Sequence, residues 1–263
     1  MINQTDKKLV SIITPSFNAM KFIEETYCSI TQQTYANWEW LITDDCSDDG
    51  TWEYISAIAL KDPRIKIIKN RCNSGAAVTR NRSIERAKGD FIAFLDSDDI
   101  WLPDKLSRHI EFMEQQQANV SFTPYLLIDE NSTDIGEIID INKEGAFSYE
   151  DMLLKKSTMG CCTVIVRSCA FSDLSMPLIR AGQDYALWLK LLKTGQKAVI
   201  FSEVLSKYRI VTNSLSRNKL KKAYNIWQVY RDIEQLNIIK ALYVFSHYAV
   251  RALFKINHSD KNA

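Results

Sequence analysis

Residues 91–99 read Phe91-Ile92-Ala93-Phe94-Leu95-Asp96-Ser97-Asp98-Asp99. The stretch is an apolar run of five residues that is followed directly by acidic residues. An apolar run without alternation is typical of a parallel strand that is buried on both faces of its sheet. Ligands of an open parallel sheet bind at the carboxyl ends of its strands. The acidic residues therefore stand where such a sheet would place its binding site.

Three earlier apolar runs alternate with helical patterns. We expect strands at residues 9–14, 38–43, 65–69 and 91–95, and helices at residues 22–33, 51–60 and 76–87. This alternation predicts an α/β fold, with a Rossmann-like, mainly parallel sheet flanked by helices on both faces. Beyond residue 99 the pattern is less regular. There we expect helices at residues 103–116, 148–154 and 185–192, strands at 120–128, 163–166, 198–201 and 204–210, and a loop at 135–145.

The composition is that of a soluble globular protein, since 46% of the 263 residues are hydrophobic and 25% are charged. The net charge of +1 argues against a nucleic-acid partner. The first residues lack the apolar segment of a secretory signal, and no uncharged apolar stretch reaches the roughly 18 residues of a spanning helix. The cysteines show no CxxC spacing and no histidine partners at zinc-site intervals, so we expect a reducing, cytoplasmic location.

The C-terminal region is basic. Residues 216–263 hold nine basic and three acidic residues, whereas the rest of the chain holds 24 basic and 29 acidic residues. Within residues 238–256, Ile239, Leu242 and Val250 share one helical face, and Lys240 and Arg251 share another. Such a basic amphipathic helix can lie on an anionic membrane surface. The alternative is a helix that covers the sheet or contacts another copy of the chain.

Acidic residues gather after two of the predicted strands. They are Asp44, Asp45, Asp48, Asp49, Asp96, Asp98 and Asp99. Carboxylates on one edge favour a cation or a hydroxyl-rich ligand that offsets their repulsion, although Asp48 and Asp49 precede a predicted helix and suit capping. The D-x-D pair of Asp96 and Asp98 suits a hard ion such as Mg²⁺ or Mn²⁺. Because such ions prefer to share phosphate oxygens, the pair suggests a metal–diphosphate ligand.

A series of motifs resembles, in order and spacing, those of family 2 glycosyltransferases. They lie at residues 10–18, 44–51, 73–75, 94–99, 183–189 and 208–216. The resemblance covers about residues 9–217 and is nearest to cytoplasmic enzymes that extend cell-surface polysaccharides, such as O-antigen, capsule or teichuronic-acid transferases. It implies the GT-A fold, followed here by a C-terminal helical extension.

The resemblance also implies roles for residues around the donor nucleotide. Thr14 and Pro15 would border the nucleobase, and Asp45 would hydrogen-bond it. Three residues of the next loop and helix would flank the nucleotide and its diphosphate: Asn73, Gly75 and Arg80. These roles place the donor at the carboxyl ends of the first three predicted strands.

The remaining roles concern the metal, the reaction and the diphosphate. Asp96 would meet the ribose or the sugar with Ser97 beside it, and Asp98 together with Asp96 would bind Mn²⁺ or Mg²⁺. Asp184 would be the catalytic base that takes the proton of the acceptor hydroxyl. Three residues would help to close over the diphosphate: Arg209, Ser214 and Ser216.

Under this resemblance the chain is an inverting, metal-dependent glycosyltransferase. The donor would be a nucleotide-diphosphate sugar, UDP-linked, and the acceptor a saccharide linked to a polyprenyl diphosphate at the inner face of the cell membrane. Residues 1–100 would form the nucleotide-sugar-binding half of one domain and residues 101–217 its acceptor-binding and catalytic half. Residues 218–263 would form basic amphipathic helices.

Three residues depart from the family pattern: Gln183 where Glu is frequent, Val211 where many members carry His, and Cys46 where Gly is usual. The first two leave open a non-catalytic, nucleotide-binding, membrane-associated partner subunit. Residues 91–98 also resemble the opening of haloacid-dehalogenase phosphatases, which gives a second alternative. For Asp184 itself, the structural alternative is an N-cap of the helix at residues 185–192.

Overall fold

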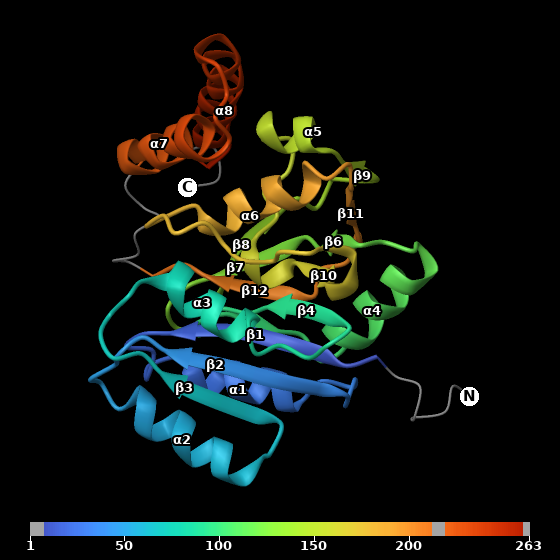
Figure 1. Ribbon diagram of the computed structural model, residues 1–263. Helices are drawn as coiled ribbons and strands as arrows, with labels where there is room; N and C mark the ends of the chain where they lie inside the picture. The colour runs from blue at the N-terminus through green and yellow to red at the C-terminus, as the bar shows by residue number, and fades with distance from the viewer. Residues whose placement is uncertain (1–7, 212–218, 260–263) are drawn as a thin grey trace.

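The computed structural model describes residues 8–211 and 219–259. Its main feature is an eight-stranded mixed sheet with helices on both faces, in the order β3-β2-β1-β4-β10-β6-β11-β9. A second sheet of four strands lies beside it, in the order β5-β12-β7-β8 (Figure 1). The α/β fold with a large helix-flanked sheet is therefore confirmed.

The first hundred residues form the parallel part of the large sheet. Its strands are β1 (Val10–Ser16), β2 (Trp38–Asp44), β3 (Ile65–Lys69) and β4 (Phe91–Phe94). The connecting helices are α1 (Ile23–Thr31), α2 (Thr51–Lys61) and α3 (Ala76–Ile84). All four strands pair in parallel. Each of these elements was predicted from the sequence, and its ends differ by only a few residues.

Successive residues of each central strand supply two separate cores. Ile12 of β1 packs with α1 and α2 on one face, and Ile13 packs with α3 and the later helices on the other. Both side chains are fully buried, and burial of each contributes about 1.5–3 kcal/mol. This double burial explains why the strands read as continuous apolar runs.

The second half of the chain extends the same sheet. Its strands there are β6 (Val120–Phe122), β9 (Ala146–Phe147), β10 (Ile165–Arg167) and β11 (Ala198–Ile200). Strand β10 is antiparallel to both β4 and β6, so β6 runs parallel to β4 and ends at the same edge. The helices are α4 (Lys105–Gln115), α5 (Tyr149–Leu153) and α6 (Gln183–Leu192). Short 3-10 turns occupy Cys161–Thr163 and Ser168–Ala170, and the first of them includes Thr163, where we had expected a strand to begin.

The small sheet was not predicted. It consists of β5 (Ile100–Trp101), β7 (Tyr125–Ile128), β8 (Asp134–Ile139) and β12 (Ser206–Arg209). The single strand expected at residues 120–128 is two strands in different sheets, because Pro124 between them lacks the N–H that a continuous ladder requires. The loop expected at 135–145 begins with β8, most of whose residues are exposed, so its sequence carries no apolar alternation.

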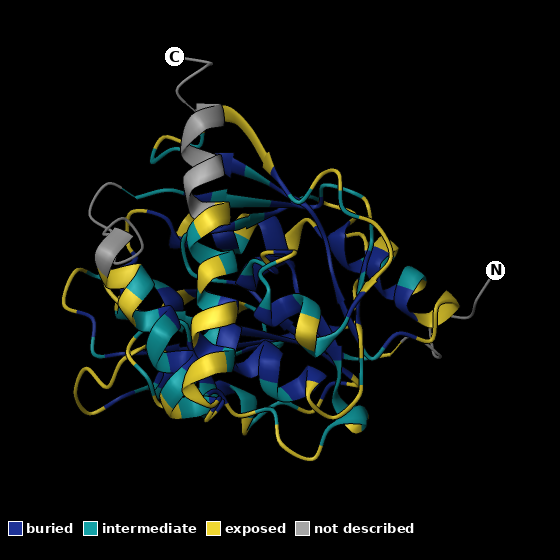
Figure 2. Cartoon of the chain, turned by 90° about the horizontal axis from the view of Figure 1, so that it is seen from above, coloured by how far each residue is buried: buried dark blue, intermediate teal, exposed yellow. Residues whose placement is uncertain are grey.

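The C-terminal extension consists of α7 (Lys219–Gln228), a π-helix (Val229–Ile233) and α8 (Ile238–Ser259). Helix α8 buries Ala241 and Val244 in the core that contains α6. The face predicted from the sequence, with Ile239 and Leu242, instead points to solvent (Figure 2). The packing alternative is therefore confirmed for one face, while a second apolar face stays exposed. None of the described helices is long and apolar enough to cross a membrane.

Candidate functional site

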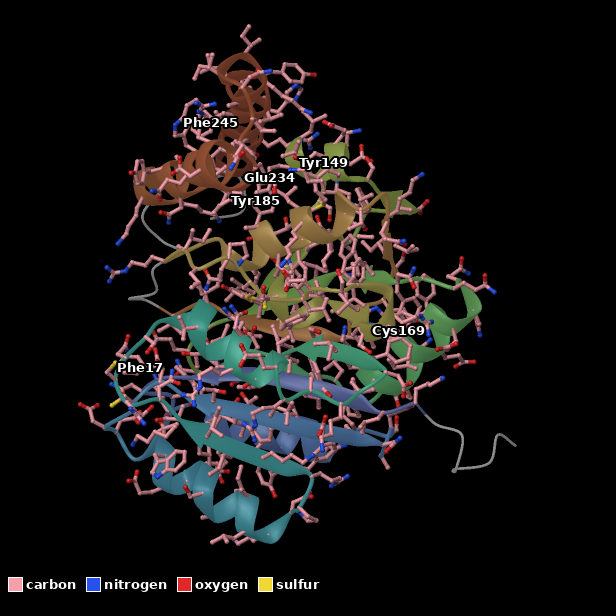
Figure 3. All side chains as sticks on the ribbon, in the orientation of Figure 1. Phe17, Tyr149, Cys169, Tyr185, Glu234 and Phe245 are labelled. Carbon is pink, nitrogen blue, oxygen red and sulfur yellow. The ribbon has the colours of Figure 1, made fainter. Side chains whose placement is uncertain are left out.

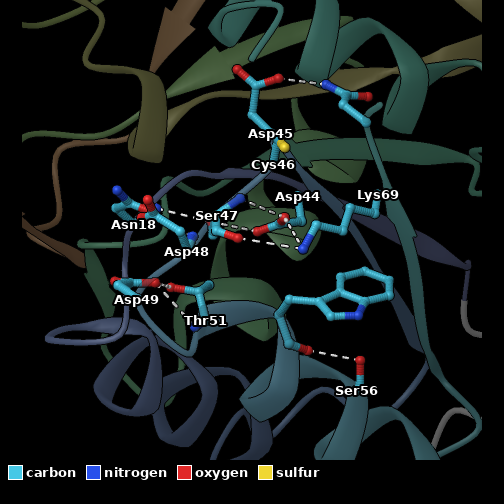
Figure 4. A network of polar contacts seen from close by, with 12 residues as sticks. Asn18, Asp44, Asp45, Cys46, Ser47, Asp48, Asp49, Thr51, Ser56 and Lys69 are labelled. Carbon is cyan, nitrogen blue, oxygen red and sulfur yellow. Dashed lines mark hydrogen bonds and ion pairs between the residues drawn. The ribbon is translucent and has the colours of Figure 1, made fainter. Parts of the chain in front are cut away.

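The loop after β2 is built around Asp44, which is fully buried. Its carboxylate accepts hydrogen bonds from the backbone N–H of Ser47 at 2.9 Å and from the Ser47 hydroxyl at 2.5 Å. The ammonium of Lys69 lies 3.9 Å away (Figure 4). Asp44 therefore shapes the turn and offers no open face to a ligand.

Asp45 connects this loop to the start of α3. Its carboxylate accepts hydrogen bonds from Asn70 Nδ2 at 2.6 Å and from the backbone N–H groups of Ser74 and Gly75, both at 2.8 Å. Gly75 has a φ of 87°, a conformation that favours glycine. The structure thus brings Asp45 and the loop of exposed Asn73 together. Asp45 itself is 3% exposed and both of its carboxylate oxygens are engaged inside the protein, so its hydrogen bond to the nucleobase stays a prediction.

Two further aspartates of the loop have different roles (Figure 4). Asp49 accepts hydrogen bonds from the backbone N–H of Met20 and of Thr51 and from the Thr51 hydroxyl, so it organises the start of α2. The side chain of Asp48 is exposed. Cys46 has a φ of 67°, which is the left-handed conformation that glycine adopts without strain and explains why glycine suits this position.

The end of β1 differs from the prediction in one residue. Thr14 is fully buried, and its hydroxyl donates to Leu95 O at 2.7 Å and accepts from Trp40 Nε1 at 2.8 Å. Its side chain is therefore unable to face a nucleobase, while Pro15 is partly exposed. Sequence reasoning missed Phe17, whose ring is 50% exposed at the carboxyl end of the strand (Figure 3). The sequence feature that could have indicated Phe17 is an aromatic residue directly after the end of a predicted strand.

Arg80 is the central cation of the site. Its side chain is 8% exposed, and Nη2 donates to Asp96 Oδ1 at 2.5 Å. Nε and Nη1 are buried and have no hydrogen-bond partner among the described residues. Burial opposes the charge, but the neighbouring carboxylate of Asp96 above all raises the pKa of Arg80 above its usual value. Two unpaired donors on a permanently charged group suit an anion with several oxygens, such as a diphosphate.

The carboxyls that follow β4 repel one another. Burial, and then the neighbouring charge of Asp96, raise the pKa of Asp98 to about 6. Burial and the charges of Asp98 and Asp96 raise the pKa of Asp99 well above its usual value, and Asp99 accepts a hydrogen bond from the backbone N–H of Arg209 at 2.9 Å. A divalent cation at Asp96 and Asp98 would relieve this repulsion, so the residues fit a hard ion. Ser97 between them is partly exposed.

No group of three or more His, Cys, Asp or Glu side chains among the described residues is arranged to hold a metal ion by itself. A cation bound by Asp96 and Asp98 would therefore need further ligands from a bound substrate or from water. This pattern is usual for Mg²⁺, which keeps several non-protein oxygen ligands.

Arg209 corrects one expectation. Its side chain is fully buried, with Nε donating to Asp98 O at 2.8 Å, Nη1 donating to Ser132 Oγ at 2.8 Å and to Asp129 O at 3.2 Å, and Nη2 pairing with Glu25 at 3.0 Å. Every nitrogen of the guanidinium is occupied inside the protein. Arg209 therefore holds the backbone of the D-x-D segment in place and is not positioned to contact a diphosphate.

Two other predicted contacts cannot be placed. Ser214 and Ser216 lie outside the described residues. Val211, which precedes them, is partly buried. The expected closure over the diphosphate thus stays a prediction for the two serines.

Asp184 lies in the first turn of α6 and is partly exposed. The N-cap of the helix is Gly182, with a φ of 79°, so Asp184 does not cap it. One carboxylate oxygen accepts a hydrogen bond from the backbone N–H of Tyr185 at 2.8 Å. The other oxygen has no hydrogen-bond partner among the described residues. Gln183 beside it is buried, and its Oε1 has no partner among the described residues. A glutamate there would bury an unpaired charge, which gives a physical reason for the neutral residue.

Asp184 and Asp96 converge on the same groups although they come from different halves of the chain. Both raise the pKa of Arg80 against the effect of burial. Burial, with Asp96 next and Asp184 further, also raises the pKa of the Cys161 thiol. Asp184 therefore lies close enough to the pair of Arg80 and Asp96 to influence the charge of these groups, and its role as the base stays a prediction.

The chain is similar to known proteins over most of its length. The model of Glycosyl transferase family 2 matches residues 11–172. The putative teichuronic acid biosynthesis glycosyltransferase TuaG of Bacillus subtilis is 44% identical over 95% of this chain and 98% of its own length. The UDP-Glc:alpha-D-GlcNAc-diphosphoundecaprenol beta-1,3-glucosyltransferase WfgD of Escherichia coli is 37% identical over 98% of both chains.

Solved structures show the same fold at low identity. Residues 1–349 of S. aureus TarS in complex with UDP-GlcNAc align with a TM-score of 0.72 at 19% identity, over 92% of this chain and 72% of that chain. The mannosyltransferase PcManGT from Pyrobaculum calidifontis, in complex with GDP-Man and Mn²⁺, aligns with a TM-score of 0.67 at 15% identity, over 94% of this chain and 74% of that chain.

Fold and site together define a glycosyltransferase with the GT-A fold. Within that class, the chain belongs to glycosyl transferase family 2. The family match confirms the enzyme class predicted from the motifs, and it gives no support to the phosphatase or to the non-catalytic partner subunit.

Proposed function

We propose that this chain is an inverting, metal-dependent transferase that moves a sugar from a UDP-sugar to a saccharide linked to a lipid through a diphosphate. The observation that carries the proposal is the buried Arg80, which pairs with Asp96 at 2.5 Å and keeps two further donors unpaired. The names of two relatives support the substrates, since both describe transfer from UDP-Glc to alpha-D-GlcNAc-diphosphoundecaprenol.

The reaction needs a base and charge compensation. Asp184 takes the proton of the acceptor hydroxyl as its oxygen attacks the anomeric carbon and the bond from that carbon to the donor phosphate breaks on the opposite side. The configuration at the carbon is inverted, and the proton ends on Asp184. The unpaired Nε and Nη1 of Arg80 bind the departing diphosphate. No covalent nucleophile is required.

A divalent ion would be held by Asp96 and Asp98. When bound, Mn²⁺ or Mg²⁺ supplies positive charge against the oxygens of the leaving diphosphate. The Mn²⁺ in the PcManGT complex supports a metal in this fold, and Arg209 holds the D-x-D backbone that presents the two carboxylates.

The nucleotide would lie along the first strands. Phe17 offers a face on which a base can stack, and Pro15 borders it. Asp45 fixes the loop with Asn73 and Gly75 against it through the two backbone hydrogen bonds. In this scheme, Thr14 does not contact the nucleotide and instead links the ends of β1 and β4 through its hydrogen bond to Leu95 O.

The C-terminal extension would place the site at the inner membrane face, as a peripheral attachment. The side chains of Ile239 and Leu242 are 79% and 55% exposed, and Val250 lies on the same face. Arg251 supplies positive charge nearby, as does Lys240, which also pairs with Glu150 at 2.9 Å. Exposed apolar side chains flanked by basic residues are the pattern of helices that lie in an anionic lipid surface.

The test is a ligand panel followed by a transfer assay. We expect UDP-sugars with Mn²⁺ to raise the Tm more than GDP- or CDP-sugars, because a ligand that binds only the native state stabilises it. The same mixture with a short-chain GlcNAc diphosphate should yield a disaccharide product. Release of inorganic phosphate without transfer would indicate a phosphatase, and binding without turnover would indicate a partner subunit. Either result would overturn the proposal.

A further inference from the structure

A second positive charge lies near Asp184 and outside the donor site. Lys155 follows Leu154, the C-cap of α5, and has a left-handed φ of 53°. Its ammonium nitrogen lies 2.9 Å from the centroid of the Tyr185 ring. Because Tyr185 follows Asp184 in α6, the lysine side chain reaches from the end of α5 to the start of the helix that carries the proposed base.

Two tyrosines hold the end of α5 in this position. Tyr185 Oη donates to Met152 O at 2.9 Å, and Tyr230 Oη donates to Leu153 O at 2.8 Å. The two hydroxyl oxygens lie 3.3 Å apart. Tyr185 lies near Glu234 and Tyr149 at the junction with the C-terminal helices (Figure 3). The position of Lys155 therefore depends both on α6, through Tyr185, and on the C-terminal extension, through Tyr230.

The surroundings of Lys155 leave its charge poorly compensated. Lys155 keeps part of its surface exposed, yet burial of its ammonium lowers the pKa well below its usual value. Asp184 opposes this effect and Lys222 of α7 adds to it. The ammonium of Lys155 lies over the Tyr185 ring, and no carboxylate of the described residues forms an ion pair with this ammonium. The charged form of a buried lysine is stabilised most by an anion placed against it.

We propose that Lys155 binds a phosphate oxygen of the acceptor's diphosphate, on the side of Asp184 that adjoins the C-terminal helices. This inference rests on the proposed function, in which the attacking hydroxyl and the diphosphate belong to the same acceptor. The donor diphosphate has its own cation, Arg80, at the end of the first-half strands. Lys155 comes from the second half, beside the extension with the exposed apolar face, where the acceptor lipid would approach.

The experiment compares two acceptors with the full chain: a GlcNAc diphosphate with a short alkyl chain, and an alkyl glycoside of the same sugar. Lys155→Met removes the charge at similar length. We expect the KM for the diphosphate acceptor to rise about tenfold or more, because one charge-assisted hydrogen bond is lost. The KM for the glycoside and for the donor should not change, and Lys155→Arg should keep most of the affinity. The matched control is Lys156→Met, an exposed neighbour paired with Asp151 at 2.6 Å, which should leave every KM unchanged.

Three results would overturn the inference. They are an unchanged KM for the diphosphate acceptor in Lys155→Met, a fall of kcat with both acceptors alike, and a rise of KM for the donor alone. Calorimetric titration of the alkyl GlcNAc diphosphate in the presence of UDP makes the same comparison without turnover. Absence of transfer by the unmodified chain would count against the proposed function, while this titration would still decide the role of Lys155.

Discussion

At the scale of single residues, the site combines charges that the protein leaves uncompensated with charges that it neutralises fully. Asp44 and Arg209 have all their polar atoms engaged inside the fold. Arg80 keeps two buried donors unpaired, and Asp98 is held beside Asp96 with a raised pKa. The first kind of residue shapes the site, and the second kind indicates where a ligand binds.

Arg209 should act on stability and not directly on the diphosphate. Replacing it with Met leaves the carbonyls of Asp98 and Asp129 without their donor, and a buried acceptor that loses its partner costs about 1–3 kcal/mol. We expect Arg209→Met to lower the free energy of unfolding by that order, measured by urea denaturation. Arg64→Met, which removes a more exposed arginine paired with Asp62, serves as the control. An Arg209 variant of unchanged stability but weakened UDP binding would restore the diphosphate role.

A buried lysine predicts how stability depends on pH. Lys105 is fully buried, donates to Thr163 O and lies 2.8 Å from His109 Nδ1. Burial lowers its pKa from 10.5 to about 7. Between these pH values the unfolded chain holds one proton more than the folded chain, so this group makes stability rise with pH across the window, by up to about 1.4 kcal/mol per pH unit.

The cost of burying Lys105 is absent above pH 10.5 and grows as the pH falls toward 7, below which it is complete. We expect Lys105→Met to flatten the slope of the unfolding free energy against pH over this window, because the variant has no such proton to bind. Chemical denaturation at a series of pH values gives both slopes. Identical slopes for the variant and the unmodified protein would contradict the placement of a largely neutral lysine in the core.

At the scale of elements, the sequence was informative where burial and periodicity coincide. The strands β1 to β4 could be predicted because each is buried on both faces, and Asp45 and Asp96 could be placed at one edge from that prediction alone. The role of Arg209 could not, because it depends on β12 pairing with β5, which joins segments about a hundred residues apart. The unpaired donors of Arg80 and the cation beside Tyr185 likewise depend on packing between distant elements.

The exposed face of α8 gives a prediction at the same scale. Deletion of the helix would also remove Ala241 and Val244 from the core, so point substitutions test attachment more cleanly. We expect the Ile239→Ser, Leu242→Ser double variant to bind anionic vesicles at least several-fold more weakly in a sedimentation assay, since about 0.8 kcal/mol is lost per exposed CH₂ removed from lipid. Donor binding should be unchanged.

The matched control for α8 is Leu60→Ser, an apolar residue on α2 with 91% of its surface exposed. It removes a similar side chain on an element remote from the extension and should leave vesicle binding unaltered. Equal sedimentation of the double variant, the control and the unmodified protein would contradict a lipid-facing role for α8.

At the scale of the whole molecule, the eight-stranded sheet joins the two halves for which we propose different functions. Strands β1 to β4 present the donor-side groups, and α6 from the second half presents Asp184. The C-terminal helices pack on α6 through Tyr185 and Tyr230, so the part of the chain that would meet the membrane adjoins the proposed base directly. The division that we propose at residue 100 therefore separates two functions, and the sheet itself continues across it.

The central claim is that Asp184 accepts the proton of the acceptor. Its most direct test is Asp184→Asn, assayed for UDP-sugar binding by calorimetry and for transfer by product formation with Mn²⁺. We expect donor affinity within about twofold of the unmodified protein and a kcat lower by about 10²–10⁴. The control is Asp173→Asn. Asp173 is an exposed acid that pairs with Lys190 of α6, the helix that carries Asp184, and this variant should retain full kcat. Full transfer activity in Asp184→Asn would contradict the account.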